Sequence, residues 1–236
     1  MHQLLNAPAT PLSPVTRLRV VTSLVPTPVS TGLTQEASLG IPACSPLVLH
    51  ELLKATRQLR PDAYQRATRE FGLTVERTQA LLEHPTPVFS ASRALKLARL
   101  LAQDPNSSEV FAAAGTAMYA ALQPELSRLL RFAVRRLPRG WRLHLMMTVA
   151  RQLAPQFAGS TSQLILVEPD EENFYFTLRD GLFADHPTTL SGAHFYYHSF
   201  LGSLLRDFAH LGGKLAAVRR PRLTLHQCTF RFTLNP

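Results

Sequence analysis

Two histidines in the last quarter of the sequence have a spacing that could support chemistry. His194 and His198 lie four residues apart, so a helix would place both imidazoles on one face, which is the spacing of a two-histidine metal pair. The same imidazoles could instead contact a ligand, including the carboxylate of a propionate group. No nearby Asp or Glu completes a metal-binding triad, so two ordinary polar positions beside an aromatic core are the alternative interpretation.

A histidine and a cysteine follow on a segment that alternates like a β-strand. Residues 222–234 read RLTLHQCTFRFTL, and apolar positions recur there with a period of two. One face of this strand carries Thr224, His226, Cys228, Phe230, Phe232 and Leu234. The other face carries Gln227, Thr229, Arg231 and Thr233. An imidazole and a thiol on the apolar face predict that the core here also forms the wall of a pocket. Because buried cysteine often acts as a small hydrophobic residue, a purely structural role stays open.

The sequence carries no motif of a self-sufficient redox or hydrolytic enzyme. No G-x-G-x-x-G follows a predicted strand, no phosphate-binding P-loop is present, and Gly159-Ser160 does not form a nucleophile elbow. A reductase that works alone with a nicotinamide or a flavin would need a dinucleotide site. The missing motif therefore favours binding over catalysis.

The elements that would position these residues form a strand–strand–helix–strand–strand unit. Residues 163–167 and 174–178 are rich in β-forming residues and flank a polar turn, so they predict an antiparallel hairpin. One side of its second strand should carry Phe174, Phe176 and Leu178. A helix over 190–211 follows, with apolar residues at core spacing: Tyr197, Leu201, Leu204, Phe208 and Leu211. Gly212 and Gly213 are expected to end this helix before a third strand at 214–218, and 223–234 supplies the fourth.

Most of the chain from 46 to 155 is predicted to be helical. Gly72 should end one helix, and Thr74, Ser90 and Ser107 are candidate N-caps of the helices that follow them. Small residues from Ala112 to Ala117 predict a tightly packed, buried helix. The chain is thus predicted to be α+β, with N-terminal helices packed on an antiparallel sheet.

A basic helix is predicted over 124–137. Its apolar stripe consists of Leu126, Leu130, Ala133 and Leu137. Its basic stripe consists of Arg128, Arg131 and Arg135. This pattern is typical of a surface helix with a basic outer face. No nucleic-acid-binding motif accompanies it, so we expect no nucleic-acid partner.

Composition sets further limits. The formal charge of +9 on 236 residues favours anionic partners without choosing among them. No apolar run approaches the ~20 residues of a transmembrane helix. The two cysteines, Cys44 and Cys228, are too few for a disulfide framework, which favours a cytoplasmic setting. Residues 1–45, rich in Pro, Ser and Thr, are interpreted as a disordered or misassigned extension, and 46–236 as a single domain.

Four segments give the chain a resemblance to a known family: VFAAAGTAMYAAL, LPRGWRLHLMMTVARQLAPQFAGS, the stretch from Phe183 through AHFYYHSFLGSLLRDFA, and QCTFRF. In their order and residue character, residues 45–234 resemble the bacteriochlorophyll 4-vinyl reductase family, whose C-terminal domain is shared with ligand-sensing modules of aromatic-responsive bacterial regulators. The resemblance implies an α+β domain around a pocket for a flat or hydrophobic ligand. Relatives often carry an acidic residue and further cysteines before the last cysteine, some of which bind zinc. KLAAVRRPRLTLHQ has neither, so no zinc site is expected around Cys228.

Two functions follow as expectations. The resemblance implies a protein of (bacterio)chlorophyll biosynthesis and photosynthesis that binds a vinyl-bearing tetrapyrrole such as divinyl protochlorophyllide, as a carrier or a reductase component. The alternative is a non-catalytic sensor of small aromatic molecules, or a protein-assembly module. The partner would be a tetrapyrrole or another hydrophobic small molecule, with a second copy of the chain or a pathway enzyme as further partners. The expected pocket lies between the 190–211 helix and the sheet and is lined by Phe157, Phe176, His194, Tyr197, His198, His226, Cys228 and Phe230.

Overall fold

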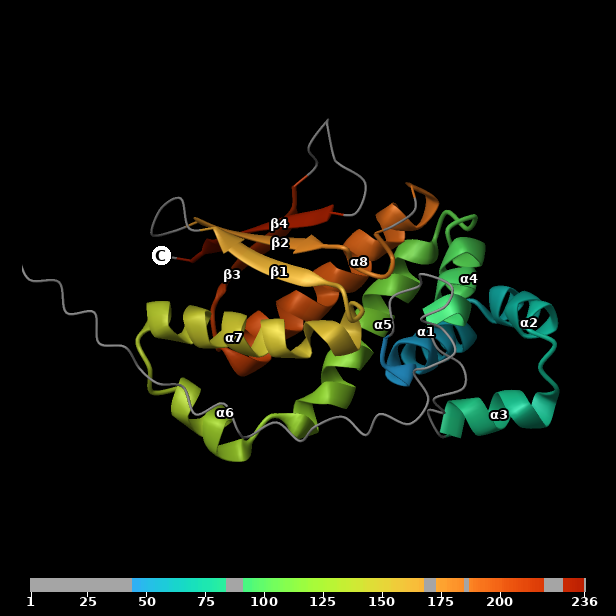
Figure 1. Cartoon of the computed structure of the whole chain (residues 1–236), viewed down its shortest axis with the longest axis horizontal. Helices are drawn as coiled ribbons and strands as arrows, with labels where there is room; N and C mark the ends of the chain where they lie inside the picture. Colours follow the sequence, from blue (N-terminus) through green and yellow to red (C-terminus); the bar gives the residue numbers. More distant parts are fainter. Residues whose placement is uncertain (1–43, 84–90, 168–172, 185–186, 219–226, 236) are drawn as a thin grey trace, which may run out of the picture.

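A computed structural model describes residues 44–83, 91–167, 173–184, 187–218 and 227–235. The helices are α1 Pro46–Leu59, α2 Pro61–Glu70, α3 Val75–Glu83, α4 Ala91–Leu101, α5 Ser107–Leu122, α6 Arg128–Val134, α7 Arg139–Phe157 and α8 Pro187–Ser203. The strands are β1 Gln163–Val167, β2 Asn173–Arg179, β3 Gly213–Ala217 and β4 Gln227–Leu234. Figure 1 shows α7 and α8 against the sheet, with α1 to α4 gathered at one end and α6 below α7.

The four strands form one antiparallel sheet in the order β1-β2-β4-β3. This arrangement confirms the predicted α+β class, with the antiparallel hairpin and the strand–strand–helix–strand–strand unit. In the register of the two central strands, Phe176 lies opposite Phe230 and Leu178 lies opposite Cys228. The expected start of the last strand, at 223, falls outside the described residues.

One face of the sheet is apolar, and it packs on the helices. Phe174, Phe176 and Leu178 of β2 are buried, as their alternation predicts, and so are Cys228 and Phe230 of β4. Residues on the opposite face are more exposed, with one exception. Thr229 is buried, and its hydroxyl lies 3.2 Å from the Thr177 hydroxyl on β2, so the two side chains satisfy each other.

Local signals near the N-terminal helices agree with the structure in two places and differ in a third. Gly72 follows α2 with φ +60°, a conformation that glycine adopts without a steric cost. The Thr74 hydroxyl accepts a hydrogen bond from the Arg77 N–H at 3.3 Å and so caps α3. Ser107, however, is the first residue of α5, and Asn106 holds the N-cap position without a side-chain bond. Ser90 lies outside the described residues.

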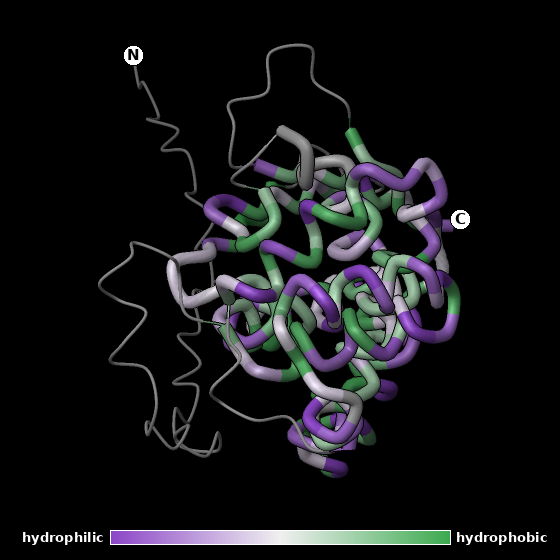
Figure 2. The backbone as a smooth tube through the Cα atoms, turned by 90° about the vertical axis from the view of Figure 1, so that its right-hand side faces the viewer, coloured by the Kyte–Doolittle hydropathy of each residue, from purple (hydrophilic) through white to green (hydrophobic). Residues whose placement is uncertain are grey.

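The central helices α5 and α8 pack at very short range. Gly115 of α5 lies against the backbone of Tyr196 on α8, and a Cβ atom there would overlap the Tyr196 carbonyl. Gly192 of α8 meets the Phe111 ring of α5 in the same way. The expected tight packing of the small-residue helix is therefore confirmed at this crossing. Figure 2 shows hydrophobic segments concentrated inside the fold and hydrophilic ones around it.

The C-terminal end of α8 differs from its prediction. After Ser203 the helix widens into a π-helical turn, Leu204–Phe208, and the Leu211 N–H donates to the Leu205 carbonyl at 3.0 Å. His210 has a left-handed backbone with φ +50°, so the helix ends there and not at Gly212 as expected. Glycine is the usual residue at such a position because other residues are strained there.

The predicted 124–137 helix is also shorter than expected. A 3-10 turn over Gln123–Glu125 precedes α6, and this turn changes the rotational phase of the helix. As a result Val134 is buried and Ala133 is exposed, the reverse of the predicted apolar stripe. The basic outer face is confirmed at Arg128 and Arg135, which are exposed, whereas Arg131 is half-buried. Within the described ranges, no helix has the length and apolar character needed to cross a membrane.

Candidate functional site

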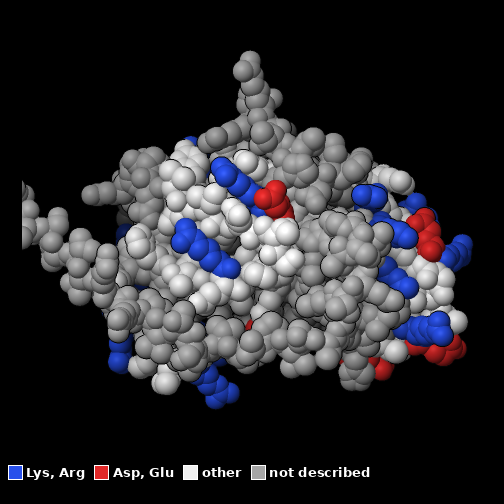
Figure 3. All heavy atoms as spheres, viewed as in Figure 1, with Lys and Arg blue, Asp and Glu red and all other residues white. Residues whose placement is uncertain are grey.

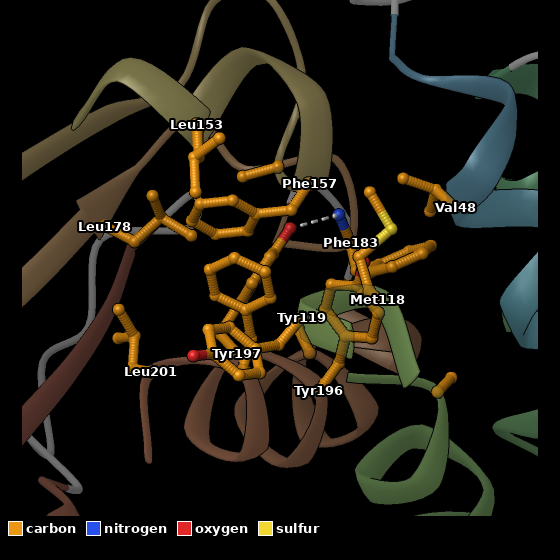
Figure 4. Packing of buried hydrophobic residues seen from close by; sticks show 14 of the residues in the cluster. Val48, Met118, Tyr119, Leu153, Phe157, Leu178, Phe183, Tyr196, Tyr197 and Leu201 are labelled. Atoms are coloured by element: carbon orange, nitrogen blue, oxygen red, sulfur yellow. Dashed lines mark hydrogen bonds between the residues drawn. The ribbon is translucent and has the colours of Figure 1, made fainter. Parts of the chain in front are cut away.

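An aromatic cluster fills the space where α7, α8 and the sheet meet. The rings of Phe157 on α7 and Phe200 on α8 stack with centroids 3.9 Å apart and an interplanar angle of 21°. Tyr197 meets the Phe157 ring edge-on at 6.2 Å, and Phe183 meets Tyr196 edge-on at 5.2 Å. Figure 4 shows Phe157, Phe183, Tyr196 and Tyr197 gathered together from α7, α8 and the segment after β2. Such geometries stabilise a core beyond the burial of apolar area.

Polar atoms in this cluster are held in their neutral forms. The Tyr197 hydroxyl accepts a hydrogen bond from the Phe183 N–H at 3.3 Å, which Figure 4 marks with a dashed line. Burial raises the pKa of Tyr197, and also that of Tyr196, well above the usual value for tyrosine. Burial likewise raises the pKa of the Cys228 thiol to about 12. Neither the phenols nor the thiol is prepared to act as a nucleophile near neutral pH.

The two α8 histidines lie at the edge of this cluster, beside the sheet. Both are half-buried, and their rings lie 5.8 Å (His194) and 6.1 Å (His198) from the Phe230 ring, as measured between centroids. His198 Nε2 donates to the Leu215 carbonyl of β3 at 2.9 Å, so this imidazole helps to fix α8 on the sheet. Among the described residues, no group of three or more His, Cys, Asp or Glu side chains is arranged to hold a metal ion.

The structure thus brings most of the predicted pocket residues together. The fully buried ones are Phe157, Phe176, Tyr197, Cys228 and Phe230. His194 and His198 join them at the edge, and His226 lies outside the described residues. These side chains contact one another, and a ligand-binding role for them stays a prediction.

A second region, which the sequence reasoning noted only as a basic stripe, is a surface that we name the α6 corner. It consists of α6, the turn after it and the start of α7, with the side chains of Arg128, Leu129, Arg131, Phe132, Arg135, Arg136, Arg139 and Trp141. Leu129 is 79% exposed, Phe132 56% and Trp141 57%. Figure 3, in the view of Figure 1, shows cationic side chains projecting at the lower left edge, where α6 lies. The signal that could have found it is Leu129 and Phe132 at a spacing of three between the arginines.

A hollow of about 280 Å³ opens at this corner. Its lining residues are Gln123, Arg128, Arg131, Phe132, Arg135, Asp207 and His210. Arg135 Nε donates to His210 Nε2 at 2.8 Å, so the imidazole is held in a neutral tautomer with its acceptor nitrogen toward the guanidinium. Partial burial, and then the charges of Arg135 and Arg142, lower the pKa of His210 below its usual value.

One further arginine, Arg142, holds together the elements around the hollow. Arg142 donates to three backbone carbonyls: Leu137 at 2.7 Å, Arg135 at 2.9 Å and His210 at 3.4 Å. It therefore ties the start of α7 both to the end of α6 and to the end of α8. Arg131 and Arg135 line the hollow, and the Arg142 bonds use only backbone oxygen atoms.

Comparisons with known proteins bear on the fold. No family model matches the sequence, and no curated protein matches it. Among solved structures, the chain is similar to one from a study of heme distortion in the H-NOX family, with a TM-score of 0.54 and 12% identity over 81% of this chain and 95% of that chain. A mutant H-NOX protein from K. algicida, in the Fe(II) unliganded state, aligns with a TM-score of 0.53 and 10% identity over 81% of this chain and 97% of that chain. A mutant H-NOX from T. tengcongensis aligns with a TM-score of 0.52 and 11% identity over 80% of this chain and 96% of that chain.

These findings correct the predicted family and function. The solved structures that match are H-NOX domains, so the resemblance to the 4-vinyl reductase family is wrong, and the expected role in chlorophyll biosynthesis and photosynthesis is wrong with it. The segments that carried the resemblance form α5, α7, α8 and β4, whose buried faces make up the core. The alternative expectation, a non-catalytic sensor or assembly module, agrees better with these structures.

Proposed function

We propose that this chain is a non-catalytic binding module that has the H-NOX fold and an interior filled by its own side chains. The observation that carries the proposal is the stack of Phe157 on Phe200, at 3.9 Å, in the middle of the space between α7, α8 and the sheet. The continuous buried core from Cys44 to Phe232 supports treating residues 46–236 as one domain.

The residues present do not fit a heme, the group named for two of the structurally similar proteins. Pockets for ligands of drug size enclose ~300–1,000 Å³. Here the stacked rings of Phe157 and Phe200 occupy the space beneath the sheet. Gly115 of α5 lies against the backbone of Tyr196 on α8, so a ligand has no room between these two helices where they cross. A macrocycle, or another hydrophobic molecule of its size, would have to displace these side chains.

Three side chains that could supply an axial ligand to a heme iron, those of His50, His198 and Cys228, would each have to change their present state to do so. Iron is held by imidazole, thiolate, thioether or phenolate groups. Within the described chain, both ring nitrogens of buried His50 face oxygen atoms at 3.0 Å, one on Glu51 and one on Leu82, and His198 Nε2 is bonded to Leu215. The Cys228 thiol, with its pKa raised to about 12 by burial, is held as the neutral thiol. Each of these groups would have to break an existing interaction or lose a proton to bind iron.

A second candidate function is a heme-binding sensor, and the likeness to H-NOX structures favours it. Titration of the purified full chain with hemin, followed by the Soret band, separates the two. We expect weak absorbance changes without a stoichiometric end point. A sharp end point at one heme per chain would overturn the proposal and support the sensor.

Two variants make this titration decisive. His194→Ala and His198→Ala each remove one half-buried imidazole beside Phe230. If hemin binds at one equivalent and one of these variants abolishes the spectrum, the imidazole is an iron ligand and the filled-interior proposal is wrong. If both variants give the same weak changes as the parent chain, binding is nonspecific, as the proposal expects.

A further inference from the structure

The exposed faces of α6 combine apolar and basic side chains. Leu129, Phe132 and Arg136 follow one another at spacings of three and four, as do Arg128, Arg131 and Arg135. Helical geometry places each set on its own stripe, and the two stripes are adjacent. The remaining stripe contains Leu130 and Val134 and faces the core. α6 therefore packs one apolar stripe on the core, and it also carries large apolar side chains on its solvent-exposed surface.

The exposed apolar groups exceed what a monomeric surface needs. Leu129, Phe132 and Trp141 are each more than half exposed, and they belong to two consecutive elements of the chain. Single exposed hydrophobic residues are common, but several large ones on adjacent elements mark an interaction surface. The guanidinium of Arg136 lies 4.2 Å from the centre of the Phe132 ring, so one cation sits directly on the apolar surface.

The surrounding charge is mostly positive. The segment from Leu126 to Val167 contains seven arginines and no acidic residue. Asp207, the acidic residue that lines the hollow, is paired with Arg206 at 2.8 Å. Arg128, Arg131 and Arg135 also line the hollow, so it carries more positive than negative charge and would attract an anionic oxygen.

We infer that the α6 corner binds the surface of an anionic phospholipid bilayer. Leu129, Phe132 and Trp141 enter the interfacial layer, and the arginines contact lipid phosphates, with one phosphate in the hollow beside Arg131. Interfacial segments have this composition, with arginine on the polar side and Trp, Phe and Leu on the other. Each arginine near such a surface contributes ~1 kcal/mol, which is about fivefold in affinity. The inference is independent of the proposal of a filled interior.

Two other anionic partners fit the surface less well. Nucleic acid would use the arginines for its phosphates and leave Leu129, the most exposed of the large apolar side chains, without a contact. An acidic protein segment would need a groove to receive it, whereas Leu129 and Phe132 stand on the outer face of a helix. The bilayer uses both the charge and the protruding apolar groups.

The chain carries its own reporter for the test. Trp141 is the single tryptophan in the sequence, so tryptophan emission, excited at a wavelength that tyrosine does not absorb, reports on the α6 corner alone. The full chain is titrated with vesicles of phosphatidylcholine containing one third phosphatidylglycerol, and with pure phosphatidylcholine vesicles, at roughly 0.1 M salt. We expect emission to shift to shorter wavelength, and the protein to float with the vesicles, only when phosphatidylglycerol is present. High salt should reverse most of the binding.

Matched variants assign the effect to the corner. Arg128→Gln with Arg131→Gln should weaken vesicle binding by about 25-fold, since each arginine accounts for about fivefold. The control, Arg66→Gln with Arg69→Gln on exposed α2, removes the same charge elsewhere and should change binding little. Leu129→Ser should weaken binding without removing charge, while Leu59→Ser at the end of α1 serves as its control. Circular dichroism confirms that each variant is folded.

Several outcomes would overturn the inference. Equal weakening by the α2 variant would show that net charge, and not the corner, attracts the vesicles. Competition by soluble glycerophosphoglycerol at the level of whole vesicles would identify a free phosphoester as the ligand. Absence of vesicle binding, together with salt-sensitive binding to polyglutamate or to a DNA duplex, would assign the surface to a macromolecular partner.

Discussion

Aromatic side chains occur in two settings in this protein, the interior between α7, α8 and the sheet, and the α6 corner. In the interior, Phe157 and Phe200 are fully buried and stacked. At the corner, Phe132 and Trp141 are more than half exposed and lie among arginines. Full burial of such a side chain stabilises a fold by about 1.5–3 kcal/mol, and an exposed ring gains this only when a partner covers it. The interior therefore accounts for stability, and the corner is the region available for recognition.

The sharpest test of this contrast removes one ring from each region. Phe200→Ala should lower the free energy of unfolding by about 3–5 kcal/mol, because it deletes a fully buried ring and leaves a cavity beside Phe157. Phe132→Ala should change it by no more than about 0.5 kcal/mol. Urea unfolding followed by circular dichroism measures both. Similar losses in the two variants would mean that the corner belongs to the core.

Glycines give a second comparison between the regions. Gly115→Ala should cost about 1–3 kcal/mol, because the new Cβ overlaps the Tyr196 backbone carbonyl and two helices must separate. Gly140, in the first turn of α7, has open space around its position, and Gly140→Ala should stabilise by about 0.4–1 kcal/mol. The same unfolding experiment reports both signs. A neutral Gly115→Ala would show that α5 and α8 can move apart and admit a ligand.

Alkaline pH should weaken the interior in a predictable window. The pKa of Cys228 is raised by burial from 9.0 to about 12, so the folded state retains a proton that the unfolded state loses above about pH 9. Its contribution to stability is complete below pH 9 and falls by about 1.4 kcal/mol per pH unit until about pH 12. Comparing the parent chain with Cys228→Ala at pH 8 and 10 isolates this thiol from the tyrosines. A parallel pH dependence of the two proteins would contradict the buried, neutral thiol.

The smallest effect is expected at the corner, on the acid side. Partial burial, with Arg135 and Arg142, lowers the pKa of His210. The neutral imidazole that accepts from Arg135 is therefore favoured above the usual histidine pKa of ~6.5, and its contribution is lost as the pH falls through the lowered value. Titration by NMR should show this, and Arg135→Gln should move the His210 pKa upward. An unchanged value in that variant would mean that Arg135 does not contribute to the lowered pKa of His210.

Sequence patterns were sufficient where the cause of the structure is local. The Thr74 cap, the left-handed Gly72 and the alternating faces of β2 and β4 depend on residues within a few positions of each other. The predicted apolar stripe contained Ala133 where Val134 faces the core, because a 3-10 turn interrupts the helix before α6. His210 was missed because its strained backbone is held by Arg142, which lies 68 residues away in the sequence.

The candidate site shows the same limit. Periodicity indicated correctly that Tyr197, Cys228 and Phe230 face the interior. It does not indicate whether the interior encloses an empty pocket or is filled, because that depends on how closely α5, α7 and α8 approach. The position of Gly115 against Tyr196 and the stack of Phe157 on Phe200 are results of three-dimensional packing.

The end of α8 at His210 couples the interior energetically to the α6 corner. α8 contributes Tyr196 and Tyr197 to the interior, and the left-handed residue that terminates its π-turn accepts from Arg135 at the corner. An anionic ligand that draws Arg135 away removes a contact that holds this residue in place, so occupancy of the corner alters the free energy of the α8 terminus. Linkage is reciprocal, and changes in the packing of α8 must alter affinity at the corner by the same factor. Binding at the surface would thereby be transmitted to the packing of the core.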